Sequence, residues 1–249
     1  MIYDAFADVY DQLMDDYDYD QWSEYYKRLI NKAHISDKAP RIVECACGTG
    51  NITIRLAQMG FNMMGVDASV SMLRSAERKA RQAGVDITFV HQDMRKLTVG
   101  RAADAVLCTC DGINYLTKIE DLKVFFSAAY RALRHGGLLA FDFSSRYKLE
   151  SIVGDSFFGE ERDGIAFLWK NELNKEKHLV RMDVTCFVRD DDGRYQRFRE
   201  EHRQRAHDQE ELIPILKECG FEEICCYGEM RMDGPKAEDQ RIHMTARKR

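Results

Sequence analysis

The chain has 249 residues, of which 45% are hydrophobic and 32% are charged, and its formal net charge is -5. No apolar run approaches the roughly 18 residues that a membrane-spanning helix needs, and the negative charge argues against nucleic acid as a partner. Residues 1–8 lack the basic and apolar regions of a secretory signal, which predicts a cytoplasmic protein. The eight cysteines lack zinc-binding spacing, so we expect reduced cysteines and no metal site.

Strand-like and helix-like segments alternate along the first part of the chain. The helical segments have capping residues or glycines at their ends, such as Ser69 before the helix that ends at Gly84. The helix that begins near Glu120 is expected to end at Gly136-Gly137. Strands separated by helices at this spacing predict an α/β fold with a largely parallel sheet and helices on both faces. The expected strands are residues 41–45, 62–66, 87–90, 104–110 and 138–143.

The alternation of strands and helices stops after the fifth expected strand. Apolar residues occupy alternate positions of 180–188, a period of two that is typical of an antiparallel strand with one buried face. Asp192-Gly193 is then a hairpin turn. Together with strands at 165–173 and 195–205, this pattern predicts an antiparallel β meander inserted in the core. A last helix capped by Asp208 and kinked or shortened by Pro214, and closing strands at 221–227 and 241–247, complete the expected elements.

A glycine-rich turn follows the first expected strand, in the sequence Glu44-Cys45-Ala46-Cys47-Gly48-Thr49-Gly50. Glycines at the carboxyl end of a strand let the backbone approach a ligand closely, and the N–H groups of the next helix favour an anion. Asp67 ends the second strand, where a carboxylate can accept hydrogen bonds from both hydroxyls of a ribose. The turn and the acid together predict a ligand of the adenosine type.

The segment from Val43 to Gly50 resembles the first motif of class I S-adenosylmethionine (SAM)-dependent methyltransferases, with Ala46 at the position of the motif's first glycine. The resemblance covers residues 41–143. It implies a Rossmann-like fold with a seven-stranded, mostly parallel sheet, SAM as the cofactor and S-adenosylhomocysteine as the product. It also implies that Asp67 binds the ribose hydroxyls and that Asp93 and Met94 face the adenine. It places Asp111, Asn114 and Tyr115 near the substrate-facing position. The candidate cofactor-binding residues are Glu44, Ala46, Gly48, Gly50, Asp67, Asp93, Met94 and Asp111.

A looser resemblance links the chain to a small group of bacterial methyltransferases, most of which have no assigned substrate. It implies that aromatic residues near the N-terminus lie over the cofactor and that the meander closes the pocket. The alternatives are that these aromatic residues belong to the core and that residues 201–205 form a charge ladder between strands. The residues that carry this resemblance are Tyr3, Phe6, Ala7, Tyr10, Asp11, Trp22, Glu201, His202, Gln204 and Arg205.

We therefore expect three parts of the chain. Residues 1–40 form a helical cap over the cofactor site, and residues 41–145 and 206–249 form the SAM-binding core. Residues 146–205 form the inserted meander, which lines the substrate pocket or makes a homodimer contact.

The resemblance implies transfer of a methyl group to an O, N or C nucleophile on a small molecule. An amine nucleophile must first lose a proton, which a carboxylate, histidine or tyrosine at the pocket can accept. Asp111, Asn114 and Tyr115 have a second interpretation, because a polar loop of this kind also forms an Asx turn. The candidate catalytic residues are Asp111, Tyr115 and His202. The candidate substrate contacts are Tyr10, Asn114, Tyr115, Asp142 and Arg205.

Three other functions compete with this hypothesis. An NAD-dependent oxidoreductase also uses a glycine turn and an acid, but its G-x-G-x-x-G fingerprint requires glycine where this chain has Thr53. A nucleic-acid methyltransferase is disfavoured by the acidic balance and by the lack of an N-P-P-Y or D-P-P-Y string. A non-catalytic SAM-binding protein stays open at this point, because an intact binding motif does not prove turnover.

Overall fold

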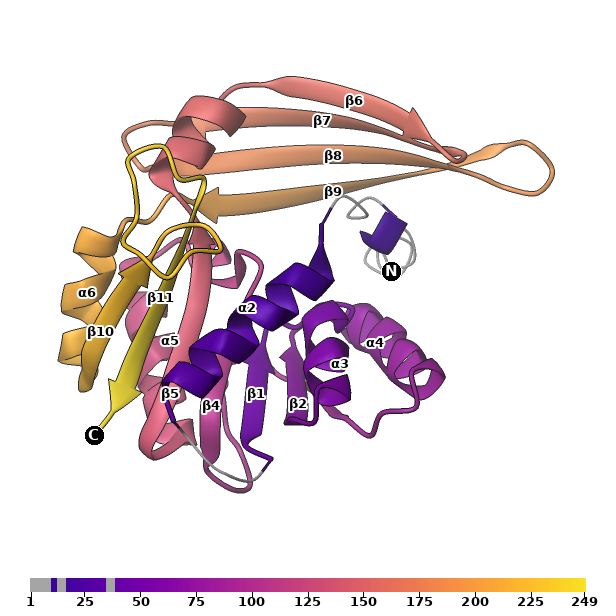
Figure 1. Cartoon of the computed structure of the whole chain (residues 1–249). Helices are drawn as coiled ribbons and strands as arrows, with labels where there is room; N and C mark the ends of the chain where they lie inside the picture. Colours follow the sequence, from indigo (N-terminus) through magenta and orange to yellow (C-terminus); the bar gives the residue numbers. More distant parts are fainter. Residues whose placement is uncertain (1–9, 13–16, 35–38) are drawn as a thin grey trace.

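The computed structural model describes residues 10–12, 17–34 and 39–249 of the chain. Its larger sheet has seven strands in the order β10-β11-β5-β4-β1-β2-β3. All neighbouring strands are parallel except at β11, which is antiparallel to both β5 and β10. The Rossmann-like, mostly parallel sheet expected from the sequence is therefore confirmed (Figure 1). The strands are β1 (Arg41–Cys45), β2 (Asn62–Asp67), β3 (Thr88–His91), β4 (Ala103–Cys108), β5 (Leu133–Ser144), β10 (Phe221–Tyr227) and β11 (Arg241–Lys248).

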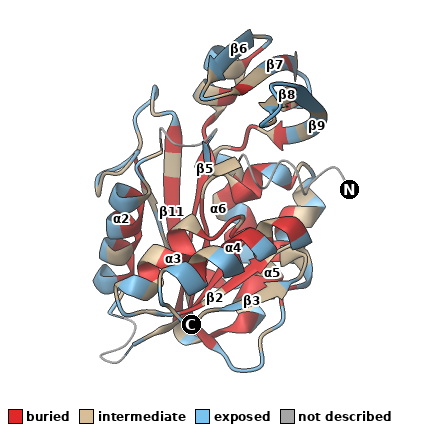
Figure 2. Ribbon diagram, turned by 90° about the vertical axis from the view of Figure 1, so that its right-hand side faces the viewer, coloured by how far each residue is buried: buried red, intermediate tan, exposed pale blue. Residues whose placement is uncertain are grey.

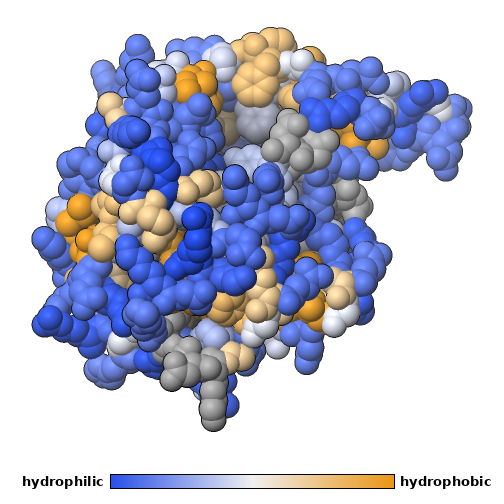
Figure 3. All heavy atoms as spheres, viewed as in Figure 1, coloured by the Kyte–Doolittle hydropathy of each residue, from blue (hydrophilic) through white to orange (hydrophobic). Residues whose placement is uncertain are grey.

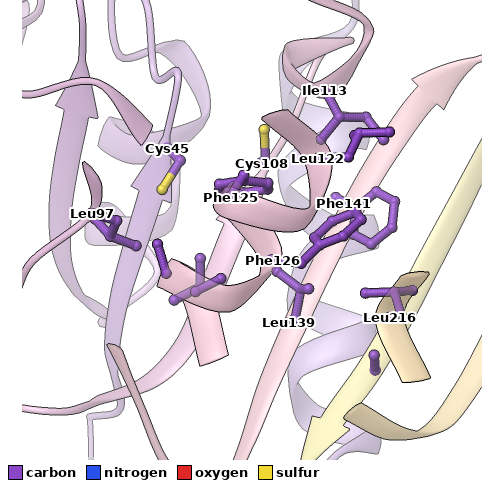
Figure 4. Packing of buried hydrophobic residues seen from close by; sticks show 14 of the residues in the cluster. Cys45, Leu97, Cys108, Ile113, Leu122, Phe125, Phe126, Leu139, Phe141 and Leu216 are labelled. Carbon is purple, nitrogen blue, oxygen red and sulfur yellow. The ribbon is translucent and has the colours of Figure 1, made fainter. Parts of the chain in front are cut away.

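Helices cover both faces of this sheet. Neighbouring residues of a strand point to opposite sides, so one strand can bury apolar side chains against helices on each face. Ile42 of β1 packs in a cluster with α2 and α3, whereas Val43 packs in the cluster that contains α5 and α6. In the second cluster the ring of Phe126 lies 5.3 Å from that of Phe141 of β5, tilted against it, and Leu216 lies beside them (Figure 4). The helices are α2 (Tyr19–Lys32), α3 (Asn51–Gln58), α4 (Val70–Gln82), α5 (Ile119–Ala132) and α6 (Gln209–Glu218).

The start of β5 corrects one boundary expected from the sequence. The helix α5 ends at Ala132 instead of continuing to the glycine pair, and β5 begins at Leu133. Lys248 of β11 donates to the carbonyl oxygens of Tyr130 and Leu133, both at 2.7 Å, and so satisfies acceptors at the helix end. The glycine pair lies in a bulge of β5, where the register with β4 shifts and Gly136 has a φ of +72°.

The inserted meander is a separate antiparallel sheet in the order β6-β7-β8-β9, which lies over one end of the larger sheet (Figure 1). Its four strands exceed the three that the sequence predicted. The missed strand β6 has nearly all of its residues exposed, so it lacks the alternation of polar and apolar residues that marks the others (Figure 2). The strands are β6 (Phe157–Arg162), β7 (Ile165–Asn174), β8 (Leu179–Arg189) and β9 (Tyr195–Arg205), and the helix η3 (Tyr147–Val153) joins them to β5.

The surface is largely polar on the face shown, and the cysteines form no disulfide bonds among the described residues. The face seen in Figure 3 is mainly hydrophilic, including the arm formed by the far end of the meander. All eight cysteines lie in the described part of the chain and are free. Among the described residues, no helix combines the length and the apolar character that crossing a bilayer requires.

Candidate functional site

The turn between β1 and α3 has the backbone shape that its glycines permit. Gly48 and Gly50 have φ values of +54° and +77°, in the left-handed region that favours glycine. Ala46 has a φ of +53°, so alanine adopts the shape expected of the motif's first glycine. A Cβ atom on Gly50 would lie 3.0 Å from the Cβ atom of Ala76 on α4, whereas a Cβ atom on Gly48 would meet nothing within 4 Å. Gly48 therefore borders open space, and Gly50 allows close packing of α4.

Asp67, at the end of β2, is joined to this turn. Its carboxylate accepts hydrogen bonds from the backbone N–H groups of Gly48 and Ser69, both at 2.8 Å. Burial raises the pKa of Asp67 above its usual value, and the backbone donors from Ser69 and Gly48 oppose that shift. The structure thus brings together the two features from which an adenosine-type ligand was predicted.

Glu44 supports the turn from inside the protein. Its carboxylate is 1% exposed and accepts hydrogen bonds from the hydroxyls of Thr109, at 2.5 Å, and of Thr53. Burial raises the pKa of Glu44 to about 7, although the two threonine donors lower it. The side chain links β1 to α3 and to the residue after β4. Glu44, expected at the cofactor, therefore acts on the turn through buried contacts.

The loop after β3 lies beside Asp67, because the N–H of Gln92 donates to the carbonyl oxygen of Asp67 at 2.9 Å. Asp93 caps the 3-10 helix η1 (Met94–Lys96), and its carboxylate binds the guanidinium of Arg95 at 2.6 Å. This side-chain hydrogen bond from Arg95 holds the pKa of Asp93 below its usual value. Met94 packs partly buried on the core. The adenine contacts expected of Asp93 and Met94 stay a prediction.

The loop after β4 is held by a buried cluster of charges. Arg241 of β11 is 2% exposed and pairs with Asp111 at 2.6 Å and with Asp142 at 2.5 Å. Asp142 also accepts hydrogen bonds from the hydroxyl of Tyr26 and the N–H groups of Cys110 and Asp111. Burial raises the pKa of Asp111, but the Arg241 guanidinium outweighs it and leaves that pKa below its usual value. The pKa of Asp142 is raised by burial.

This cluster gives a structural role to two candidate residues. Both carboxylates neutralise Arg241 and fix the loop, in which Cys110 and Asp111 have positive φ values. The base and cofactor contact expected of Asp111 and the substrate contact expected of Asp142 stay predictions. Arg241 was missed because it follows Asp111 by 130 positions in the sequence. The one signal for it is an arginine at the first position of the closing strand.

Two further candidates for substrate contact have structural roles. Asn114, in the 3-10 helix η2 (Gly112–Tyr115), is fully buried. Its amide donates to the carbonyl oxygens of Ser144 and Arg205 and accepts from the N–H of Ser144. The guanidinium of Arg205 binds both carboxylate oxygens of Glu211, at 2.7 and 3.1 Å. These contacts tie the loop after β4 to β5 and β9, and the substrate contacts expected of the two side chains stay a prediction.

Tyr115 and His202, both expected to be catalytic, come together from the core and the meander. The hydroxyl of Tyr115 lies 3.5 Å from Nδ1 of His202, and the two rings meet edge to face at 6.0 Å. Tyr115 is 48% exposed. Nε2 of His202 lies 3.3 Å from Glu200, a carboxylate that is 5% exposed. Sequence reasoning missed Glu200, although it shares the alternating face of His202 and Gln204 on β9.

The described part of the N-terminal segment contacts both the glycine turn and the meander. Tyr10 packs against Ile165 of the meander, as do Met72 of α4, Val188 and Phe198. Burial raises the pKa of Tyr10 well above its usual value. The next residue, Asp11, was not singled out as a site residue from the sequence.

Asp11 accepts hydrogen bonds from the hydroxyl of Thr49 at 2.6 Å and from the amide of Asn51 at 2.9 Å, next to Gly50. It also pairs with Lys79 of α4 at 2.6 Å. By contrast, α2 packs on the sheet as a layer of the core. Tyr3, Phe6 and Ala7 lie outside the described residues.

Comparisons with known proteins agree with this geometry. Residues 42–137 match a methyltransferase domain family. The putative methyltransferase YqeM of Bacillus subtilis (strain 168) is 36% identical over 249 residues, which cover 100% of this chain and 98% of the relative. The crystal structure of a SAM-dependent methyltransferase from Clostridium acetobutylicum ATCC 824 superposes with a TM-score of 0.89 at 32% identity, over 99% of this chain and 98% of that one. A glycine/sarcosine N-methyltransferase of Aphanothece halophytica is 29% identical over 203 residues, 78% of this chain and 70% of the relative.

The chain belongs to the class I SAM-dependent methyltransferases. It is therefore an enzyme that uses SAM, and the dehydrogenase and non-catalytic alternatives are set aside. The residues present fit this cofactor. Open space lies in front of Gly48, where a Cβ atom would project, and the carboxylate of Asp67 ends the neighbouring strand. Asp67 keeps acceptor capacity for ribose hydroxyls, because a carboxylate oxygen has two lone pairs, and the N–H groups of Gly48 and Ser69 each donate to a different oxygen.

Proposed function

We propose that this methyltransferase acts on a small molecule that binds between the loop after β4 and the meander. The observation that carries the proposal is the meeting of Tyr115, from η2, with His202, from β9. A nucleophile placed there is covered by the meander, and the packing of Tyr10 and of Met72 from α4 against Ile165 of the meander adds to the cover. Covered sites suit small acceptors better than the surface of a macromolecule.

SAM would be held by Gly48 and Gly50 at the turn, by Asp67 at the ribose, and by Asp93 and Met94 at the adenine. Its sulfonium group supplies an activated methyl group, so the protein has no need to activate the donor. The work left to the chain is to align the nucleophile and to exclude water. Where the nucleophile carries a proton, Tyr115 and His202 are the groups placed to receive it.

The relatives support a small acceptor. The name of the Aphanothece halophytica relative states that it methylates glycine and sarcosine, which are small amines. The acidic composition of this chain, with a net charge of -5, is unfavourable for binding nucleic acid. The cytoplasmic location and the homodimer contact through the meander stay predictions.

Methylation of a fractionated cell extract tests the size of the acceptor. The protein is incubated with SAM labelled in the methyl group, and the label is followed in small-molecule, protein and nucleic-acid fractions. We expect label in the small-molecule fraction, and none when Asp67→Ala replaces the native protein. Label that enters the protein or nucleic-acid fraction instead contradicts the proposal.

A further inference from the structure

Glu200 is a buried carboxylate whose oxygens make no hydrogen bond with the described part of the chain. The residue is 5% exposed, and within residues 10–12, 17–34 and 39–249 neither Oε1 nor Oε2 has a hydrogen-bond partner. Across the sheet it faces Val184 of β8, which is itself buried. Buried carboxylates are ordinarily paired or hydrogen-bonded, because an uncompensated charge in an apolar setting is costly. Glu200 therefore needs an explanation that the fold does not supply.

The neighbouring Glu201 shows what an ordinary glutamate of this strand does. It points to the opposite face of β9 and pairs with Arg203 at 2.7 Å and Arg181 at 3.9 Å. For Glu200, the basic side chain found within 4 Å among the described residues is His202, with Nε2 at 3.3 Å. No described arginine or lysine neutralises it.

The location of Glu200 connects it with the acceptor site. β9 is the strand of the meander that lies nearest the core (Figure 1), and its end is tied to η2 by the hydrogen bond from Asn114 to the carbonyl oxygen of Arg205. His202 lies between Glu200 on one side and Tyr115 on the other. A negative charge thus lies behind a ring that can accept a proton, with an exposed tyrosine in front of it.

We propose that the methyl acceptor is a primary or secondary amine, which binds as an ammonium ion in the field of Glu200. This inference rests on the proposed function, because it names the substrate class of the same site. A cationic ligand supplies the positive charge that Glu200 lacks, and the face of the Tyr115 ring attracts the same cation. A neutral alcohol of the same shape offers neither interaction.

The same carboxylate explains how the nitrogen becomes a nucleophile. The ammonium group gives one proton to His202 at Nδ1, the nitrogen that faces Tyr115, and keeps the electron pair of the broken N–H bond. That pair forms the new N–C bond with the methyl group, and the electrons of the broken C–S bond go to sulfur. The positive charge moves from the substrate to the imidazolium of His202 and stays beside Glu200 throughout. The products are the N-methylated ammonium ion, S-adenosylhomocysteine and a proton on His202, which is then released to water.

Binding of matched probes to protein saturated with S-adenosylhomocysteine tests this inference without turnover. The probes are amine and alcohol pairs that share one carbon skeleton, from ethylamine and ethanol to benzylamine and benzyl alcohol, and titrations are followed by calorimetry and by NMR. We expect the native protein to prefer the amine within a pair. Glu200→Gln should weaken amine binding by roughly tenfold or more, because the negative charge behind His202 that attracts the ammonium ion is removed.

Glu201→Gln is the matched control, since it removes the neighbouring carboxylate from the opposite face of β9, and it should bind amines as the native protein does. Retained affinity of both variants for S-adenosylhomocysteine shows that they fold. A protein that binds S-adenosylhomocysteine but shows no preference for amines, or that keeps the preference in Glu200→Gln, overturns the inference alone. A native protein that fails to bind S-adenosylhomocysteine overturns the proposed function itself.

Discussion

The carboxylate of Asp67 accepts a hydrogen bond from the backbone N–H of Gly48 at 2.8 Å, which joins the end of β2 to the glycine turn after β1. The two residues are 19 positions apart in the sequence, and parallel pairing of β1 with β2 brings them together. The contact fixes the turn before any ligand binds. A site prepared in this way loses less conformational entropy when the cofactor binds.

Replacement of Gly48 by alanine should weaken SAM binding by roughly tenfold or more, because the new methyl group projects into the open space in front of the turn. Gly60→Ala is a matched control. Gly60 also has a positive φ, of +94°, and a Cβ atom there also meets nothing within 4 Å, but the residue lies in the turn between α3 and β2. Both variants should lose a similar stability, about 1–2 kcal/mol. Titration calorimetry with SAM separates them, and equal affinities in the two variants would contradict the assignment of Gly48.

Glu44→Gln should change the pH dependence of stability. The pKa of Glu44 is raised to about 7 from the usual 4.5, so between these values the folded protein binds more protons than the unfolded chain. The contribution of Glu44 to the free energy of unfolding therefore falls as the pH rises through this window. Relative to Glu44→Gln, the native protein should lose roughly 2–3 kcal/mol. Urea unfolding at both ends of the window measures the loss, and Glu77→Gln, an exposed change on α4, should not reproduce it. If the free energy of unfolding changed with pH in the same way for the native protein and for Glu44→Gln, the raised pKa of Glu44 would be refuted.

Arg241→Met should lower the free energy of unfolding by about 3–5 kcal/mol, because it leaves Asp111 and Asp142 buried without their cation. Arg249→Met serves as the comparison. Arg249 pairs with Glu222 at 2.6 Å, but its side chain is 74% exposed, so its loss should change stability little. Urea denaturation of both variants gives the two values. A small effect for Arg241→Met would mean that the cluster does not hold the loop after β4.

Lys79→Met should reduce SAM affinity several-fold without unfolding the protein. The ammonium of Lys79 donates to Asp11 and Asn51, both at 2.6 Å, and to Thr49 at 3.0 Å, so it holds the residues on either side of Gly50. Arg81→Met removes an exposed cation from the same helix and should leave the affinity unchanged. Unchanged SAM affinity in Lys79→Met would show that this network does not shape the turn.

Much of the fold follows from local patterns in the sequence. The strands β1 to β4 and the meander strands β7 to β9 were predicted because apolar runs and periods of two are local signals. The edge strand β6 was missed because exposed residues on both faces leave no periodic pattern. The bulge at Gly136-Gly137 was read as a helix end because glycine marks both features, and only the register of β4 against β5 distinguishes them.

The cofactor site was more predictable than the acceptor site for a physical reason. The turn and Asp67 belong to short segments whose backbone conformation is determined by a few neighbouring residues. The environments of Asp111 and Asp142 depend on Arg241, which reaches them only after β11 inserts beside β5. Glu200 shows its unusual burial only once β9 lies against the core.

The central claim is that the turn and Asp67 bind SAM. Titration calorimetry of the purified protein with SAM, S-adenosylhomocysteine and NAD, repeated on Asp67→Ala and on the exposed control Asp86→Ala, tests it most directly. We predict micromolar binding of both adenosyl ligands to the native protein and to Asp86→Ala, its loss in Asp67→Ala, and no binding of NAD. Binding of NAD without SAM, or full SAM affinity in Asp67→Ala, would contradict the account.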